Sequence, residues 1–220
     1  NADIGLAFDG DADRVFLVDE AGQSLSGSVT TALVAKNILE REPGSVIIHN
    51  LICSRSVHET IINHGGQALR SRVGHSYIKE LMAETDAAFA GEHSGHYYFR
   101  DNYRADSGLI AALLVMQEMS DKGVPLSSLR RDYDSYSATG EINFNVDNPT
   151  DVMERIGNIY SNYELDYLDG LTVNADEWWF NLRPSNTEPL LRLNLEAHDA
   201  EIMEREISRV RESLEEFTQI

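Results

Sequence analysis

The stretch that organises the rest of the sequence reads Asp9-Gly10-Asp11-Ala12-Asp13-Arg14. Apolar runs at residues 4–8 and 15–18 flank it, and both are typical of buried strands. The aspartates therefore lie in a loop between strands, where carboxylates at every second position converge on one side. Oxygen ligands without Cys or His favour Mg²⁺ or Ca²⁺ over zinc, and few protein ligands leave room for water or a phosphate, as Mg²⁺ prefers. We therefore interpret Asp9, Asp11 and Asp13 as Mg²⁺ ligands.

Two other interpretations of this loop remain open. A calcium EF-hand would also begin with these three aspartates and would use Glu20 at its twelfth position. However, Arg14 stands at the sixth position, where an EF-hand requires Gly, and the flanking runs favour strands over helices. The other alternative is a solvated acidic turn, although three alternating aspartates between apolar strands would be an odd surface turn.

The composition limits the class of protein. A chain of 220 residues with 42% apolar residues can bury a substantial core in one large or two modest domains. No apolar run approaches the roughly 20 residues that span a bilayer, and no signal peptide is visible. The single cysteine, Cys53, excludes an internal disulfide and fits a reducing compartment, so we expect a cytoplasmic protein. The formal net charge of −19 repels nucleic acid and anionic membranes, so we expect neither as a partner.

Strands alternate with helices up to about residue 135. The pattern predicts strands at residues 45–51, 67–73 and 87–90, and helices at 27–42, 54–64, 75–85, 108–119 and 126–133. This alternation indicates an α/β domain with a mixed, mostly parallel sheet and helices on both faces.

The rhythm changes after Ser135. The pattern there predicts helices at 148–160 and 199–218, and strands at 141–146, around 165, at 171–173, 178–182 and 190–197. The apolar stripe of the last helix spans under three heptads, which favours packing on its own sheet over a coiled coil. The sequence therefore predicts a second, α+β domain.

The loop Gly91-Glu92-His93-Ser94-Gly95-His96 follows a predicted strand. Glu92, Ser94 and His96 project from it at alternate positions, and an acceptor beside a hydroxyl can bind neighbouring hydroxyl groups of a sugar. His96 is a candidate for proton transfer. The alternative is a polar turn with a satisfied histidine.

Two further loops have the composition of anion sites. Residues 183–189 combine an Arg fork, hydroxyl groups and an amide between two strands, with Arg192 nearby, and resemble a phosphate cradle. Gly74-His75-Ser76 opens a helix, whose N-terminus attracts anions, with Lys79 one turn further on. Ser76 acting only as an N-cap would explain the second loop almost as well.

These four loops together resemble the phosphomannomutase/phosphoglucomutase family of the α-D-phosphohexomutase superfamily. They occur in the family's order: a metal-binding loop at 9–14, a helix start near the substrate at 74–79, a sugar-recognition loop at 91–96 and a phosphate-binding loop at 183–189. Asn186 resembles this branch, since the phosphoglucosamine mutase branch more often has Gly there.

The resemblance implies four domains around a central cleft. Residues 1–23 would be the C-terminal remnant of domain 2, residues 24–135 the α/β domain 3, and residues 136–220 domain 4, an α+β lid similar to TATA-binding protein. We expect a C-terminal fragment, because a strand begins at Ile4 before any complete domain. Domain 1, which bears the phosphoserine, would be a missing partner from the same chain.

The resemblance also implies the reaction, which is phosphoryl transfer between the C1 and C6 oxygens of mannose or glucose phosphate through a bisphosphate. Asp9, Asp11 and Asp13 would hold Mg²⁺ against the phosphoserine. The implied catalytic residues are Arg14, which would orient that phosphate, and His96, which would move a proton. The implied substrate-binding residues are His75, Glu92, Ser94, Arg183, Ser185, Asn186 and Thr187.

One position departs from the family pattern. The family often places a Lys near the substrate where this chain has Ile52, and Arg55 can replace only its charge because Arg does not readily give up a proton. We expect the fragment alone to lack mutase activity. A competing hypothesis is a stand-alone sugar-phosphate-binding or regulatory module without catalysis.

Overall fold

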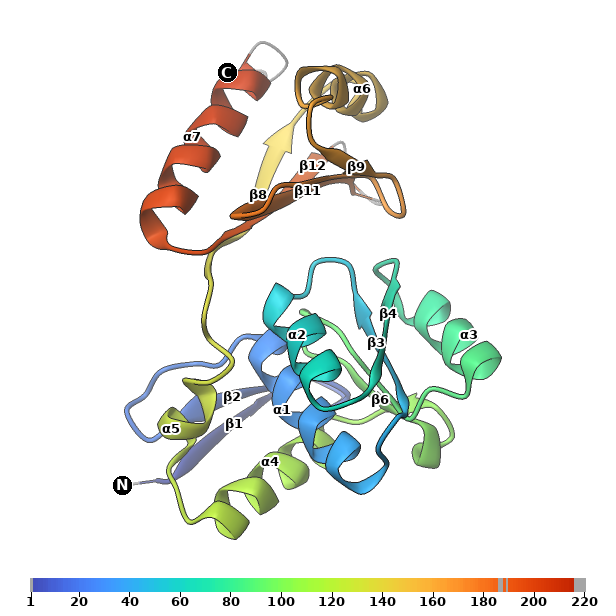
Figure 1. Cartoon of the computed structure of the whole chain (residues 1–220), viewed down its shortest axis with the longest axis vertical. Coiled ribbons are helices and arrows are strands. Elements are labelled where there is room, and N and C mark those ends of the chain that lie inside the picture. The colour runs from blue at the N-terminus through green and yellow to red at the C-terminus, as the bar shows by residue number, and fades with distance from the viewer. Residues whose placement is uncertain (1, 186–187, 189, 216–220) are drawn as a thin grey trace. The chain divides into compact units, whose positions relative to one another are not determined.

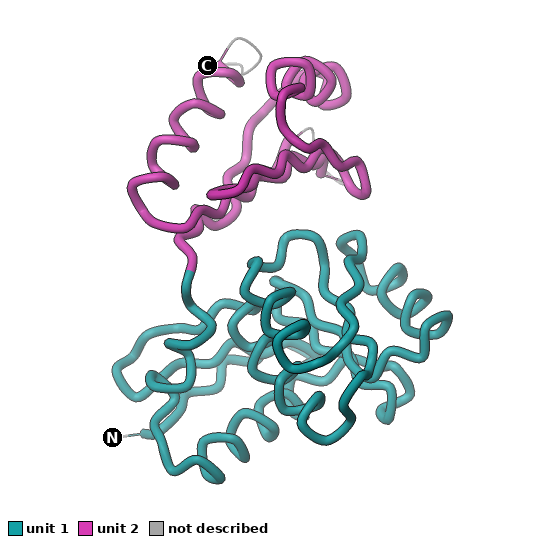
Figure 2. Tube along the Cα trace, in the orientation of Figure 1, with its two compact units in different colours: residues 1–135 teal, residues 136–220 magenta. Residues whose placement is uncertain are grey.

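The computed structural model describes residues 2–185, 188 and 190–215. The chain forms two compact units, residues 1–135 and 136–220, which are coloured separately in Figure 2. Each unit is described by itself below. The helices of the described part are all too short or too polar to cross a membrane.

The described residues of the first unit, 2–135, form seven strands, five α-helices and one 3₁₀ turn. Their arrangement is drawn in Figure 1. Its strands are β1 Ile4–Phe8, β2 Val15–Asp19, β3 Val46–Asn50, β4 Gln67–Ser71, β5 Phe89–Gly91, β6 Tyr97–Phe99 and β7 Ala105–Asp106. Its helices are α1 Gly27–Arg41, α2 Arg55–Asn63, α3 His75–Thr85, α4 Gly108–Lys122 and α5 Leu126–Arg130, with the 3₁₀ turn at Arg100–Asn102.

The main sheet of this unit has the strand order β4-β3-β5-β6-β7. Strand β3 pairs in parallel with β4 and β5, whereas β6 pairs antiparallel with β5 and β7. The predicted fold class, a mixed α/β sheet, is confirmed. The sequence pattern missed β6 and β7, because runs of three and two residues are too short to show an alternation. These two strands contribute the antiparallel half of the pairings.

Helices cover both faces of this sheet because its strands alternate apolar side chains between two cores. Ile47 and Phe89 point into a cluster with apolar residues of α1, α2 and α4. Their neighbours Ile48 and Ala90 point the other way and pack with Ile78 and Met82 of α3. The prediction of helices on both faces is therefore confirmed.

Strands β1 and β2 form a separate antiparallel hairpin. Val15 and Leu17 of β2 are fully buried, and α4 packs against this strand. In contrast, Leu6 and Phe8 of β1 are each 39% exposed, so the prediction of two buried strands is wrong for β1. The reason is that α4 and α1 pack against β2, whereas β1 makes its main contacts in the described part of the chain with β2.

The second unit is one antiparallel sheet with two helices. The strand order is β8-β12-β11-β10-β9. The elements are β8 Ser137–Asn145, α6 Pro149–Ile159, β9 Glu164–Asp166, β10 Leu171–Asn174, β11 Trp178–Pro184, β12 Leu190–Ala197 and α7 Ala200–Glu215. Both helices contribute to one core with the inward side chains of the strands, so the last helix packs on its own sheet as predicted.

Candidate functional site

The predicted metal loop is the turn of the β1–β2 hairpin. Ala12 has φ +61°, a left-handed conformation that is uncommon outside Gly and turns the chain sharply. The ligand atoms of Asp9, Asp11 and Asp13 lie within 4.8 Å of one another. The structure therefore brings the three predicted ligands together, and strands rather than EF-hand helices flank the loop.

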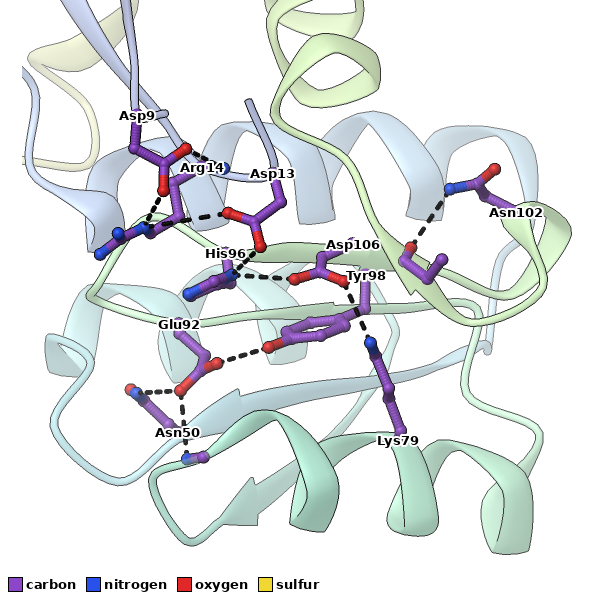
Figure 3. A network of polar contacts seen from close by, with 12 residues as sticks. Asp9, Asp13, Arg14, Asn50, Lys79, Glu92, His96, Tyr98, Asn102 and Asp106 are labelled. Carbon is purple, nitrogen blue, oxygen red and sulfur yellow. Dashed lines mark hydrogen bonds and ion pairs between the residues drawn. The ribbon is translucent and has the colours of Figure 1, made fainter. Parts of the chain in front are cut away.

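Arg14 binds the first carboxylate of this loop. Its backbone N–H donates to Oδ1 of Asp9 at 3.2 Å, and its Nε donates to Oδ2 at 2.7 Å (Figure 3). The hydrogen bond from the Arg14 side chain lowers the pKa of Asp9. This bond keeps Asp9 ionised and fixes the guanidinium of Arg14 beside the loop.

Asp13 lies within ion-pair distance of Arg14 and His96 but carries a carboxylate oxygen that accepts no hydrogen bond in the described part of the chain. Loss of hydration raises its pKa, and the negative charges of Asp11 and Asp9 add to this effect. Its Oδ1 is a buried atom without a hydrogen-bond partner among the described residues. A hard divalent cation would satisfy this oxygen and neutralise the clustered charge, so the all-oxygen donor set fits such an ion.

His96 lies against this loop and contacts two carboxylates. Its Nδ1 is 2.9 Å from Oδ2 of Asp106 and 3.8 Å from Oδ2 of Asp13 (Figure 3). Lys79 donates to the other oxygen of Asp106 at 3.1 Å. Burial alone would raise the pKa of Asp106, but the hydrogen bond from Lys79 reverses the shift and lowers it. Asp106 is therefore a fixed anion that orients the imidazole ring.

Backbone contacts join the two loops, which are about 80 residues apart in sequence. Arg14 and His96 form an isolated antiparallel bridge, and the Val15 N–H donates to the carbonyl of Gly95 at 3.2 Å. The start of α4 also approaches closely, since a Cβ on Gly108 would lie 2.7 Å from the carbonyl carbon of Arg14. The main chain thus sets the distance between the candidate metal ligands and His96.

Glu92 belongs to the predicted sugar-recognition loop and is buried, with 2% exposure. Its Oε1 accepts from the Tyr98 hydroxyl at 2.7 Å, and its Oε2 accepts from Asn50 Nδ2 and the Gly74 N–H, both at 3.3 Å (Figure 3). Burial and the neighbouring negative charge raise the pKa of Tyr98, so its hydroxyl stays protonated and donates. Glu92 connects the end of β3, the start of α3 and strand β6, and its role toward a sugar stays a prediction.

The remaining predicted residues of the first unit lie near these groups in sequence and differ in exposure. Ser94 is partly exposed, and His75 is exposed at the first position of α3. The N-cap of α3 is Gly74, so no side chain caps this helix. The interpretation of Ser76 as the cap is therefore wrong. Ile52, which stands where the family often has Lys, is buried with 8% exposure.

Sequence reasoning missed three residues of this network, Asn50, Tyr98 and Asp106. Asn50 is completely buried at the end of β3, and a polar residue closing an apolar parallel strand is a signal that could have found it. Tyr98 and Asp106 lie on the two strands that the pattern missed, so neither residue could be assigned to an element from the sequence.

In the second unit the predicted phosphate loop follows β11. Arg183 donates through Nη2 to Oε2 of Glu141 at 2.9 Å, and Nη1 of Arg192 lies 3.4 Å from Oε1 of the same carboxylate. Nη2 of Arg192 is 3.5 Å from the Ser185 hydroxyl. The predicted residues Asn186 and Thr187 lie outside the described residues. Sequence reasoning missed Glu141, which resembles any surface charge on a strand.

Comparison with known proteins identifies the family. The sequence profile described as "Phosphoglucomutase/phosphomannomutase, alpha/beta/alpha domain III" matches residues 26–136. The profile of the C-terminal domain of the same family matches residues 141–213. The chain belongs to the phosphoglucomutase/phosphomannomutase family. The resemblance drawn from the four loops is thereby confirmed.

Individual members of the phosphoglucomutase/phosphomannomutase family resemble the chain over nearly all its length. A phosphomannomutase of Methanocaldococcus jannaschii is 44% identical over 96% of this chain and 47% of its own length. A phosphomannomutase of Escherichia coli K12 is 42% identical over 92% of this chain and 45% of its own length. A crystal structure of a family protein from Burkholderia thailandensis aligns with a TM-score of 0.86 at 31% identity, over 97% of this chain and 46% of that one. The chain thus spans about half the length of these relatives.

Proposed function

We propose that this chain acts in a phosphohexomutase that interconverts hexose 6-phosphate and hexose 1-phosphate, with mannose or glucose as the sugar, through a bisphosphate intermediate. The observation that carries the proposal is the convergence of Asp9, Asp11 and Asp13 beside His96. Phosphoryl transfer needs charge neutralisation and positioning more than covalent help, and this arrangement suits it. The family membership supports the same reaction class.

Asp9, Asp11 and Asp13 would hold the metal ion, which we propose is Mg²⁺. The bound ion would neutralise negative charge on the phosphoryl group during transfer. Oxygen donors alone suit Mg²⁺, and Asp13 offers an oxygen that makes no hydrogen bond within the described part of the chain.

The other groups of the first unit bind, orient and move a proton. Arg14, held by Asp9, would orient the phosphate of a phosphoserine supplied by the N-terminal domains of the same protein. His96, held through Nδ1 by Asp106, would exchange a proton with the reacting sugar hydroxyl through Nε2. Sugar hydroxyl groups would contact His75, Glu92 and Ser94.

The phosphate that is not transferred would bind the second unit. The residues proposed for this role are Arg183, Ser185, Asn186 and Thr187. Arg183 supports it because a guanidinium fork matches the geometry of phosphate oxygens. We place the protein in the cytoplasm, in keeping with its one buried, free cysteine.

Mutase assays with glucose 1-phosphate and mannose 1-phosphate test the proposal. The purified 220-residue chain should give no turnover, and the protein carrying both this chain and the serine-bearing domains should interconvert at least one of the two sugar phosphates. Turnover by the 220-residue chain alone would contradict the need for the phosphoserine. Sugar-phosphate binding without turnover by the complete protein would favour the alternative, a binding or regulatory module.

A further inference from the structure

The sheet of the second unit has one apolar face and one polar face. Leu191, Leu193 and Leu195 of β12 point into the core that α6 and α7 cover. Side chains alternate along a strand, so Arg192 points to the opposite face. By the same alternation Arg183 of β11 and Glu141 of β8 lie on that polar face, since Leu182 and Ile142 belong to the core.

Two arginines on this face stand directly opposite each other. Arg183 pairs with Arg192 in the β11–β12 register, and like charges in that position repel. Glu141 contacts both guanidinium groups, at 2.9 Å and 3.4 Å, with a different carboxylate oxygen for each. The side chains of Glu141 and Arg192 are 33% and 30% exposed, whereas that of Arg183 is 12% exposed, so solvent and a ligand reach the trio mainly from the side of Glu141 and Arg192. One carboxylate therefore offsets part of the charge of an arginine pair that is partly accessible.

We propose that Glu141 is a resident counter-anion that lowers the affinity of Arg183 and Arg192 for a phosphate monoester. The inference rests on the proposed function, in which this loop binds the phosphate that is not transferred. A carboxylate and a phosphate offer guanidinium groups the same kind of acceptor, an anionic oxygen, so they compete for the same donors. Even a phosphate that leaves Glu141 in place must bind close to its negative charge.

Weakened binding suits the proposed reaction. A bisphosphate that reorients within the enzyme must present each of its two phosphates to the reacting groups in turn. The phosphate bound to the second unit must therefore dissociate from it during every cycle. An arginine pair without a neighbouring anion would hold a phosphate dianion more tightly and release it more slowly. Glu141 holds Arg183 and Arg192 beside each other and limits their affinity for phosphate.

Titration of the 220-residue chain with glucose 6-phosphate and with inorganic phosphate, followed by calorimetry at low ionic strength, tests the inference. Glu141→Gln should bind both ligands about tenfold more tightly than the unchanged chain, because the variant removes one nearby negative charge. The matched control is Glu164→Gln, an exposed glutamate on β9 of the same sheet, which should leave the affinity unchanged. Added salt should shrink the gain, because it screens exposed charges.

The outcomes separate the inference from the proposed function. Unchanged or weaker binding by Glu141→Gln would overturn the inference, whereas tighter binding by that variant alone supports it. Arg183→Ala should lose phosphate binding, and wild-type affinity in that variant would overturn the proposed role of the loop itself. If Glu141→Gln fails to fold, Glu141→Asp keeps the test open. Its shorter side chain withdraws the carboxylate, so it should also bind more tightly, by a smaller factor, and unchanged or weaker binding would again overturn the inference.

Discussion

Each unit has a cluster of like charge with an ion of the opposite sign beside it. In the first unit, three aspartates lie close together, and Arg14 is 2.7 Å from Asp9 and 3.9 Å from Asp13. In the second unit, Arg183 and Arg192 share Glu141. The clusters differ in where the counter-ion comes from, because Arg14 belongs to the same loop as its partners whereas Glu141 comes from another strand. A site with a local counter-ion can be predicted from sequence, and a site assembled across a sheet needs coordinates.

The largest effect should be on the free energy of unfolding, which we expect to fall far more when the buried Glu92 is replaced than when the partly exposed Glu141 is replaced. Glu92→Ala would leave the buried donors of Asn50, Gly74 and Tyr98 without an acceptor and should cost about 3 kcal/mol of unfolding free energy. Glu141→Ala removes a partly exposed ion pair and should cost below about 1 kcal/mol. Urea unfolding of both variants measures the difference.

Glu80→Ala, on the exposed side of α3, is the matched control for the first unit and should unfold like the unchanged chain. Equal losses in Glu92→Ala and Glu141→Ala would contradict the view that one site rests on a buried network and the other on a solvated pair.

The next effect concerns the cation that the first cluster should bind. Asp13→Asn removes the carboxylate charge of a proposed ligand whose Oδ1 accepts no hydrogen bond in the described part of the chain, so Mg²⁺ affinity should fall about tenfold or more. Calorimetric titration with MgCl₂ measures this change. Asp121→Asn, an exposed aspartate on α4, should bind Mg²⁺ as the unchanged chain does. A uniform loss in both variants would mean that Mg²⁺ responds only to net charge.

Titration of Asp9 gives a smaller effect and tests the counter-ion role of Arg14. The hydrogen bond from Arg14 holds the pKa of Asp9 below its usual value of 3.8. Asp9 therefore contributes stability that is complete above the unfolded pKa and is lost as pH falls through the folded pKa. Arg14→Gln should raise the Asp9 pKa toward 3.8, as carboxyl ¹³C NMR would show.

Arg131→Gln, an exposed change in the same unit, should leave the Asp9 titration where it is. An Asp9 pKa that stays low in Arg14→Gln would show that another group, and not Arg14, sets the charge state of this cluster.

The sequence predicts the parts of the molecule that depend on local pattern. The helix His75–Thr85 and the strand Leu190–Ala197 match their predicted bounds, because each carries a full period of apolar residues between turn signals. The candidate metal loop can be proposed from sequence because its three aspartates lie within five residues. Glu92 is predicted as a site residue, but its hydrogen-bond partners lie on other strands and at a helix start.

Long-range packing explains what the sequence could not provide. The strands Tyr97–Phe99 and Ala105–Asp106 are too short for a pattern, and they form because β5 offers an edge to β6, which in turn offers its other edge to β7. Asp106 reaches His96 only through that pairing. Glu141 meets Arg183 across an intervening strand, from 42 residues away in the sequence. These contacts depend on which strands pair and in which register, and neither composition nor residue spacing predicts that pairing.

Side-chain Nε–Hε NMR of the arginines, recorded while Mg²⁺ and inorganic phosphate are added separately to the 220-residue chain, tests most directly whether the two charge clusters take opposite ions. The account predicts that Mg²⁺ shifts the Arg14 resonance and leaves Arg183 and Arg192 in place, and that phosphate does the reverse. Phosphate shifting Arg14 while sparing Arg183 and Arg192, or Mg²⁺ leaving Arg14 unmoved, would contradict it.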